Sequence, residues 1–147
     1  MVTGGEDRLI KFWDLRKLKS PVKTILGHEH WVSTVKYNRF HDQLLFSGSS
    51  DCKVHLWRVS SVSSAPLLEP EEDPQSGADG SGDFGGIADV GRGEAADIRV
   101  RTFNEHEESV NSVAWSTCDA WVLASLSFDG RVVLNHVPSS EKYKILL

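Results

Sequence analysis

Two sets of serine, histidine and aspartate residues have the side chains that a hydrolase could use. A hydrolase triad uses serine as the nucleophile, histidine as the general base and aspartate as the group that orients the histidine. In both sets the histidine precedes the aspartate by 23 residues and the serine precedes it by four. The sets are His28, Ser47 and Asp51, and His106, Ser125 and Asp129.

The fixed spacing of these sets argues against catalysis. An enzyme needs one active site, whereas a structural repeat requires the same residue types in the same phase. Neither serine lies in a Gly-x-Ser-x-Gly turn, which would present a nucleophile between a strand and a helix. We therefore predict that the chain has no catalytic residues and is not an enzyme.

Metal and cofactor motifs are weak in this sequence. His28, Glu29 and His30 are adjacent, but no cysteine or carboxylate cluster accompanies them at ligand spacing. The two cysteines, Cys52 and Cys118, lie in different repeat units and suggest no disulfide or zinc framework, which is typical of a reducing compartment. We expect neither a metal ion nor a cofactor.

The repeated residues are better explained as a structural hydrogen-bond network. An earlier unit has Thr3 and Asp7 at the same spacing, and Asp7 precedes Asp51 by 44 residues. A tryptophan follows the aspartate by six residues in the first two units, whereas Asn135 occupies that position in the third. Such a network rigidifies a core only when every partner is present, because an unpaired buried donor costs roughly 1 to 3 kcal/mol. The predicted network residues are Thr3, Asp7, Trp13, His28, Ser47, Asp51, Trp57, His106, Ser125 and Asp129.

Short runs rich in β-branched and aromatic residues flank these positions. Segments 9–13, 31–37, 53–57, 109–115 and 131–134 have this composition and partly alternate between apolar and polar residues. The pattern predicts β-strands, and no segment has a convincing helical period. A repeat of ~40 to 45 residues is typical of the four-stranded WD40 blade, and the chain resembles the WD-repeat family. The fold class that we predict is all-β.

The repeats predict a partial WD40 β-propeller with about two and a half four-stranded blades. We expect an incomplete blade over residues 1–18, WD repeats over 22–59 and 98–137, and a closing strand over 143–147. Closed propellers have ~4 to 8 blades, and closure of the ring removes the exposed sheet edges. Missing blades or another chain are therefore needed to cover the open edge, which otherwise favours aggregation.

Residues 63–97 lie between the two repeats and differ from them in composition. They contain nine acidic residues and one arginine, a net charge of −8, whereas the whole chain has −5. Because the segment has few large apolar side chains, we expect a disordered acidic loop that is tolerated as a surface insertion. The alternative is a regulatory segment that binds a basic partner or is phosphorylated at Ser76 or Ser81. Its acidity disfavours nucleic-acid binding.

The C-terminal third and two earlier segments resemble the EARP and GARP complex-interacting protein family. The similar segments are 29–32, 41–45, 105–110, 124–131 and 143–147, and the acidic insertion has the same place before the last blade. This resemblance implies a seven-bladed propeller that acts as a non-enzymatic adaptor. It also implies binding to multisubunit vesicle-tethering complexes in endosomal recycling and in retrograde transport from endosomes to the Golgi.

Propellers bind partners through loops and strand edges, so we expect contacts just outside the network. The candidates are Trp31 and Ser109, which follow the histidines, and Ser50 and Phe128, which precede the turn aspartates. Trp31 has the alternative of packing between blades.

The class of adaptor and its location in the cell are a separate expectation. A chromatin-associated or ubiquitin-ligase adaptor is the alternative to a tethering adaptor, because one fold serves many functions. We recognise no leader, membrane-spanning run or lipidation motif in the sequence. We therefore expect a cytoplasmic protein that its partners recruit to the trans-Golgi network and endosomes, without inserting into the membrane itself.

Overall fold

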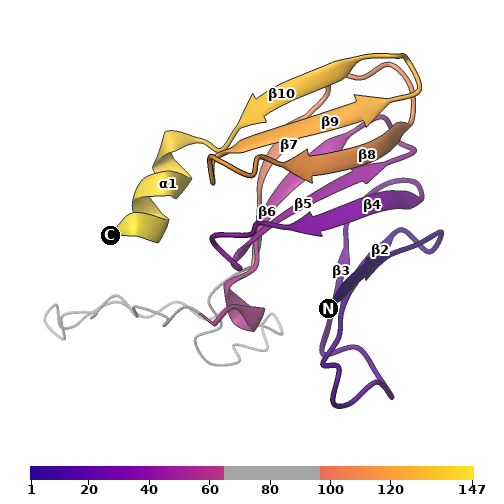
Figure 1. Ribbon diagram of the computed structural model, residues 1–147. Coiled ribbons are helices and arrows are strands. Elements are labelled where there is room, and N and C mark those ends of the chain that lie inside the picture. The colour runs from indigo at the N-terminus through magenta and orange to yellow at the C-terminus, as the bar shows by residue number, and fades with distance from the viewer. Residues whose placement is uncertain (65–96) are drawn as a thin grey trace, which may run out of the picture.

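The computed structural model describes residues 1–64 and 97–147. Most of the predicted acidic loop at 63–97, including Ser76 and Ser81, therefore lies outside the described residues. In the described part, ten strands form three antiparallel sheets, and one α-helix follows the last strand. The sheets stack in chain order with the second in the middle (Figure 1). This arrangement confirms the predicted all-β fold class and the partial WD40 propeller.

The elements have the following bounds. The first sheet contains β1 (Val2–Gly4), β2 (Leu9–Phe12) and β3 (Lys23–Leu26). The second contains β4 (Val32–Tyr37), β5 (Leu44–Ser49), β6 (Val54–Arg58) and β7 (Ile98–Phe103). The third contains β8 (Val110–Trp115), β9 (Val122–Ser127) and β10 (Val132–His136). A short 3-10 helix (Ser60–Val62) follows β6, and α1 (Ser139–Leu146) follows β10.

Each repeat contributes its first strand to the preceding sheet. The strand that opens the repeat predicted at 22–59 is β3, and it pairs with β2 of the first sheet. The strand that opens the repeat predicted at 98–137 is β7, and it pairs with β6 of the second sheet. The exchange links neighbouring sheets, and it leaves the third sheet with three strands among the described residues. Among the described residues, β10 is therefore an edge strand of that sheet.

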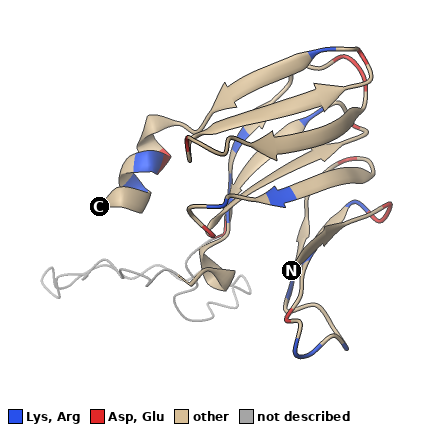
Figure 2. Cartoon of the chain, in the orientation of Figure 1, with Lys and Arg blue, Asp and Glu red and all other residues tan. Residues whose placement is uncertain are grey.

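The middle sheet is buried on both faces, which explains the continuous apolar runs of β5 and β6. Leu44, Phe46 and Leu56 pack toward the third sheet, whereas Leu45 and Trp57 pack toward the first. Because alternate side chains of a strand point to opposite faces, each interface between sheets receives every second residue. Charged residues lie mostly in the turns and in α1, as Figure 2 shows.

Two glycines allow neighbouring sheets to approach closely. A Cβ atom at Gly4 would lie 2.5 Å from Val32 Cγ1, and a Cβ atom at Gly48 would lie 2.6 Å from Val110 Cγ1. Each glycine directly follows the network hydroxyl residue of its unit. Leu126 has the equivalent position in the third sheet, and 38% of its surface is exposed. Within the described residues, nothing packs on that face of the third sheet as β4 and β8 pack on the first two.

The prediction of a closing strand at 143–147 is wrong, because residues 143–146 belong to α1 and Leu147 follows the helix. The helix begins after Pro138, whose carbonyl accepts the N–H of Glu141. The carboxylate of Glu141 is buried and accepts hydrogen bonds from Arg58 at 2.9 Å and from Lys144 at 2.8 Å. Ile145 packs on the core between the second and third sheets. These contacts hold the segment as a helix at the end of the sheets opposite the β9–β10 turn (Figure 1).

Candidate functional site

The second unit forms a continuous chain of hydrogen bonds. Trp57 Nε1 on β6 donates to Ser47 Oγ on β5 at 2.9 Å. Ser47 Oγ lies 2.8 Å from His28 Nε2, and His28 Nδ1 lies 3.0 Å from Asp51 Oδ2. Because an indole N–H only donates and a carboxylate only accepts, the serine hydroxyl donates to Nε2 and Nδ1–H donates to the aspartate. The structure thus brings these four sequence-predicted residues together.

Burial and hydrogen bonding together determine the charge states in this chain of hydrogen bonds. His28 is 5% exposed, and burial is the main cause that lowers its pKa from the usual value. Burial opposes ionisation of Asp51, but the neighbouring His28 and the N–H groups of Glu29 and Lys53 lower its pKa overall. A neutral histidine beside an ionised aspartate is the state that the bond directions require.

The third unit repeats this arrangement without its fourth member. His106 Nε2 lies 2.8 Å from Ser125 Oγ, and His106 Nδ1 lies 3.3 Å from Asp129 Oδ2. Asn135 stands in the position of the tryptophan, but its buried Nδ2 has no hydrogen-bond partner among the described residues. Ser125 therefore receives no donor equivalent to the indole.

The first unit is joined only in part. Trp13 Nε1 donates to Thr3 Oγ1 at 2.9 Å. Asp7 accepts the N–H of Leu9 at 3.2 Å and pairs with Lys11, so it stabilises its own turn. The structure does not connect Asp7 with Thr3 and Trp13.

The network serines are inaccessible to a substrate. Ser47 is 0% exposed and Ser125 is 2% exposed. The Ser47 oxygen already bonds to both Trp57 and His28. A nucleophile must approach the reacting atom to ~3 to 3.5 Å, so this geometry favours a structural role.

The described part of the chain has neither a metal-binding cluster nor a membrane-spanning helix. Residues 1–64 and 97–147 contain no group of three or more His, Cys, Asp or Glu side chains that could hold a metal ion. Among the same residues, no helix has the length and apolar composition needed to cross a membrane.

The four candidate partner-binding residues, which we call the rim, are linked in a row by hydrogen bonds. The Ser50 N–H donates to the Trp31 carbonyl at 3.0 Å, and the Phe128 N–H donates to the Ser109 carbonyl at 3.1 Å. Ser109 Oγ connects the two pairs by donating to the Ser50 carbonyl at 3.5 Å. Trp31 is 50% exposed and Phe128 is 71% exposed. Neither ring is buried between the described sheets.

Two features of the site were missed by the sequence reasoning. His55 on β6 stacks on His28 with ring centroids 4.1 Å apart, and no motif indicates this residue. The residue after each turn aspartate has a positive φ, which favours glycine. These φ values are 66° at Arg8, 65° at Cys52 and 79° at Gly130. The Asp129-Gly130 pair was the signal that could have indicated this turn.

Comparisons with known proteins agree with this geometry. The EIPR1 beta-propeller family matches residues 1–57, and the family described as WD domain, G-beta repeat matches residues 98–134. Over these two ranges the chain is similar to the EIPR1 beta-propeller and WD40-repeat families. The two family matches include every residue of the hydrogen-bond networks described above.

Three relatives indicate how far the similarity extends. The chain is 43% identical over 97% of its length to EARP and GARP complex-interacting protein 1 of Homo sapiens, of which it covers 36%. It is 35% identical over 99% of its length to EARP-interacting protein 1 of Caenorhabditis elegans, of which it covers 38%. It is 31% identical over 83% of its length to WD repeat-containing protein DWA2 of Arabidopsis thaliana, of which it covers 30%. The chain thus spans about a third of the length of these relatives.

Proposed function

We propose that this chain is a non-enzymatic WD-repeat adaptor that binds vesicle-tethering complexes of the EARP and GARP type. Its role would lie in endosomal recycling and in retrograde transport from endosomes to the Golgi. The observation that supports this best is the 43% identity over 97% of the chain to EARP and GARP complex-interacting protein 1. Because the similarity covers nearly the whole chain, it includes the rim as well as the buried network.

The buried network supports the non-enzymatic part of the proposal. In the second unit the serine, histidine and aspartate are bonded to one another and to an indole N–H. The hydroxyl group has no exposed surface from which to attack a substrate. The same arrangement recurs in the third unit, so its geometry is explained by the repeat.

The rim supports the adaptor part of the proposal. Trp31 and Phe128 are large rings that stand exposed on connections held by a rigid scaffold. Tryptophan is one of the residue types that most often dominate the binding energy of protein interfaces, and aromatic residues in general are enriched there. Partners bound at this rim would recruit a cytoplasmic protein to endosomes and the trans-Golgi network.

The proposal is tested by retention of purified EARP and GARP complexes on the immobilised chain. We expect the unmodified chain to retain them and the Trp31→Ala/Phe128→Ala variant to retain at least about tenfold less, as loss of an interface anchor predicts. Phe40→Ala is the matched control, because Phe40 is 54% exposed and lies between β4 and β5, away from the rim. This control should bind normally.

The outcomes separate the function from the surface. Failure of the unmodified chain to retain either complex would reject tether binding by this chain. Normal retention by the rim variant would instead reject the rim as the contact surface. In cells, nuclear enrichment with recovery of histones or ubiquitin-ligase subunits would indicate the other adaptor class.

A further inference from the structure

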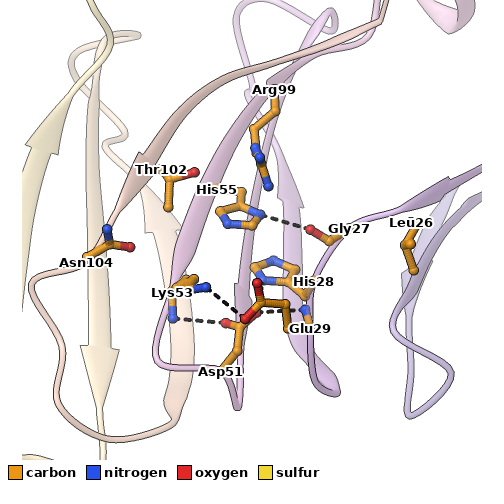
Figure 3. Close-up of a pocket in the computed structure, with 10 residues that line it drawn as sticks. All are labelled: Leu26, Gly27, His28, Glu29, Asp51, Lys53, His55, Arg99, Thr102 and Asn104. Carbon is orange, nitrogen blue, oxygen red and sulfur yellow. Dashed lines mark hydrogen bonds and ion pairs between the residues drawn. The ribbon is translucent and has the colours of Figure 1, made fainter.

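A polar cavity of about 330 Å³ lies beside the network, between the first and second sheets. Leu26 and Gly27, at and after the end of β3, form one side of it. Another side is formed by residues on β7 and just after it, namely Arg99, Thr102 and Asn104. Figure 3 shows the two groups facing each other across His55 and His28. Both walls belong to the described chain, and the exposed side chain of Arg99 leaves the cavity open to solvent.

A β-bulge places the polar side chains of β7 on the cavity face. The register between β6 and β7 shifts between Leu56 and Trp57, so that Val100 has no partner across the ladder. Side chains alternate along a regular strand, so Arg99 and Thr102, three residues apart, would otherwise point to opposite faces. The bulge turns both toward the first sheet. Bulges are common beside functional sites because they redirect side chains in this way.

Four polar groups in the cavity have no hydrogen-bond partner within residues 1–64 and 97–147. The side chains of Arg99, Thr102 and Asn104 form no hydrogen bond or ion pair with another described residue. His55 is 2% exposed, and its Nδ1 donates to the Gly27 carbonyl at 2.9 Å. Its Nε2 is then an acceptor, and this buried atom has no partner in the described part of the chain. A buried polar atom without a partner is unfavourable, so this cavity lacks a hydrogen-bonding group.

The repeat does not require a histidine at this position. Lys11, His55 and Val133 are equivalent, since each pairs with the network hydroxyl residue of its own sheet. A lysine and a valine occupy this position in the other two units, so the sheet forms there without a histidine. Among the described residues, the buried imidazole at this position is therefore specific to the second sheet.

We propose that this cavity binds a carboxylate side chain of an acidic peptide. The guanidinium of Arg99 presents a planar fork that matches a carboxylate. Thr102 and Asn104 add a hydroxyl and an amide donor, and a peptide N–H supplies the donor that His55 Nε2 lacks. A glutamate or aspartate within an extended peptide has both groups close together. The proposal goes beyond tether binding at the rim, because the cavity and the rim share no residue.

The other charges of the cavity favour a singly charged group. Lys53 Nζ is paired with Glu29 Oε2 at 2.9 Å, so Arg99 is the cation that remains unpaired there. Asp51 and Glu29 place two carboxylates at the same cavity. They repel any incoming anion, and the repulsion is about twice as large for a phosphate group with nearly two negative charges as for a carboxylate with one.

The test is a binding titration of the full chain with a labelled six-residue peptide of alternating glutamate and serine. The matched probe has glutamine in place of each glutamate. Arg99→Gln should weaken binding by about tenfold, the factor expected for one lost charge-assisted hydrogen bond, and Thr102→Val should weaken it less. Arg101→Gln is the control, because Arg101 is an exposed arginine on the same strand that stacks over Phe103. Circular dichroism verifies that each variant is folded.

Each outcome decides the proposal. Selective loss with Arg99→Gln, and no binding of the glutamine peptide, supports it. Equal losses with Arg99→Gln and Arg101→Gln would show that only general surface charge attracts the peptide, and would overturn it. Tighter binding of a phosphoserine peptide than of the glutamate peptide would overturn the assignment to a carboxylate. Undetectable binding of the glutamate peptide to the unmodified chain would reject the site.

Discussion

Removing the hydroxyl of Ser47 should cost more stability than removing the hydroxyl of Ser125. Ser47→Ala deprives two groups of their partner: Trp57 Nε1, which donates to the hydroxyl, and His28 Nε2, which accepts from it. These residues are 6% and 5% exposed, so water does not readily replace the lost bonds. Each unpaired buried polar group costs roughly 1 to 3 kcal/mol, which gives roughly 2 to 6 kcal/mol for the pair.

The equivalent change in the third sheet affects one group. Ser125→Ala leaves His106 Nε2 without a partner, whereas Asn135 makes no bond to the serine that could be lost. The expected cost is therefore roughly 1 to 3 kcal/mol. The two variants should differ by roughly 1 to 3 kcal/mol in free energy of unfolding, with Ser47→Ala the less stable.

Urea unfolding followed by circular dichroism measures this difference. With a urea dependence of about 1 to 3 kcal/mol per molar, the two midpoints should be separated by roughly 1 M. Exposed Ser140→Ala is the control and should change stability by less than about 0.5 kcal/mol. Equal midpoints for Ser47→Ala and Ser125→Ala, or a lower midpoint for Ser125→Ala, would refute the reasoning that the indole bond completes the network.

Three further predictions follow from single features of the fold. Burial holds the pKa of His55 in the folded chain at about 4, whereas the unfolded chain protonates this histidine near pH 6.5. Acidification from pH 6.5 to 4 should therefore lower the free energy of unfolding by about 3 kcal/mol. His55→Phe should remove this part of the pH dependence when urea titrations at several pH values are compared. Cys52→Gly should raise the thermal midpoint, because φ is 65° there and a left-handed non-glycine residue costs about 1 kcal/mol; a lower midpoint would contradict this. Glu141→Ala should speed amide exchange in α1, because it removes the hydrogen bond from Arg58 that holds the helix; unchanged exchange would show that apolar packing alone suffices.

The architecture could be predicted because its signals are local and repeated. The 44-residue step from Asp7 to Asp51 fixes the repeat length, and the segments 9–13 and 31–37 between them partly alternate in polarity. The bonds between Ser47 and its neighbours follow from the same spacing, since a tight turn places the aspartate beside the histidine of the incoming loop. No long-range information was needed for these features.

The features that could not be predicted depend on tertiary contacts. Tyr143, Ile145 and Leu147 alternate as in a strand, but the buried ion pair of Glu141 with Arg58 holds the segment as a helix. The bulge at Val100 leaves no sequence signal, because it is defined by register against β6. The polar cavity was missed for the same reason.

Hydrogen bonds connect the buried network directly to the backbone of the rim. Asp51 Oδ2 accepts the N–H of Glu29 at 3.0 Å, and Asp129 Oδ2 accepts the N–H of Glu107 at 3.0 Å. Each of these amides lies two residues before a rim position, so the turn aspartate fixes the backbone that presents the rim. Trp31 in turn receives the N–H of the residue before Asp51 on its carbonyl. An exposed side chain binds most strongly when its backbone is already ordered, because less conformational entropy is lost on binding. On the proposed function, the buried polar residues would contribute to partner binding without contacting the partner, through the order that they impose on the rim.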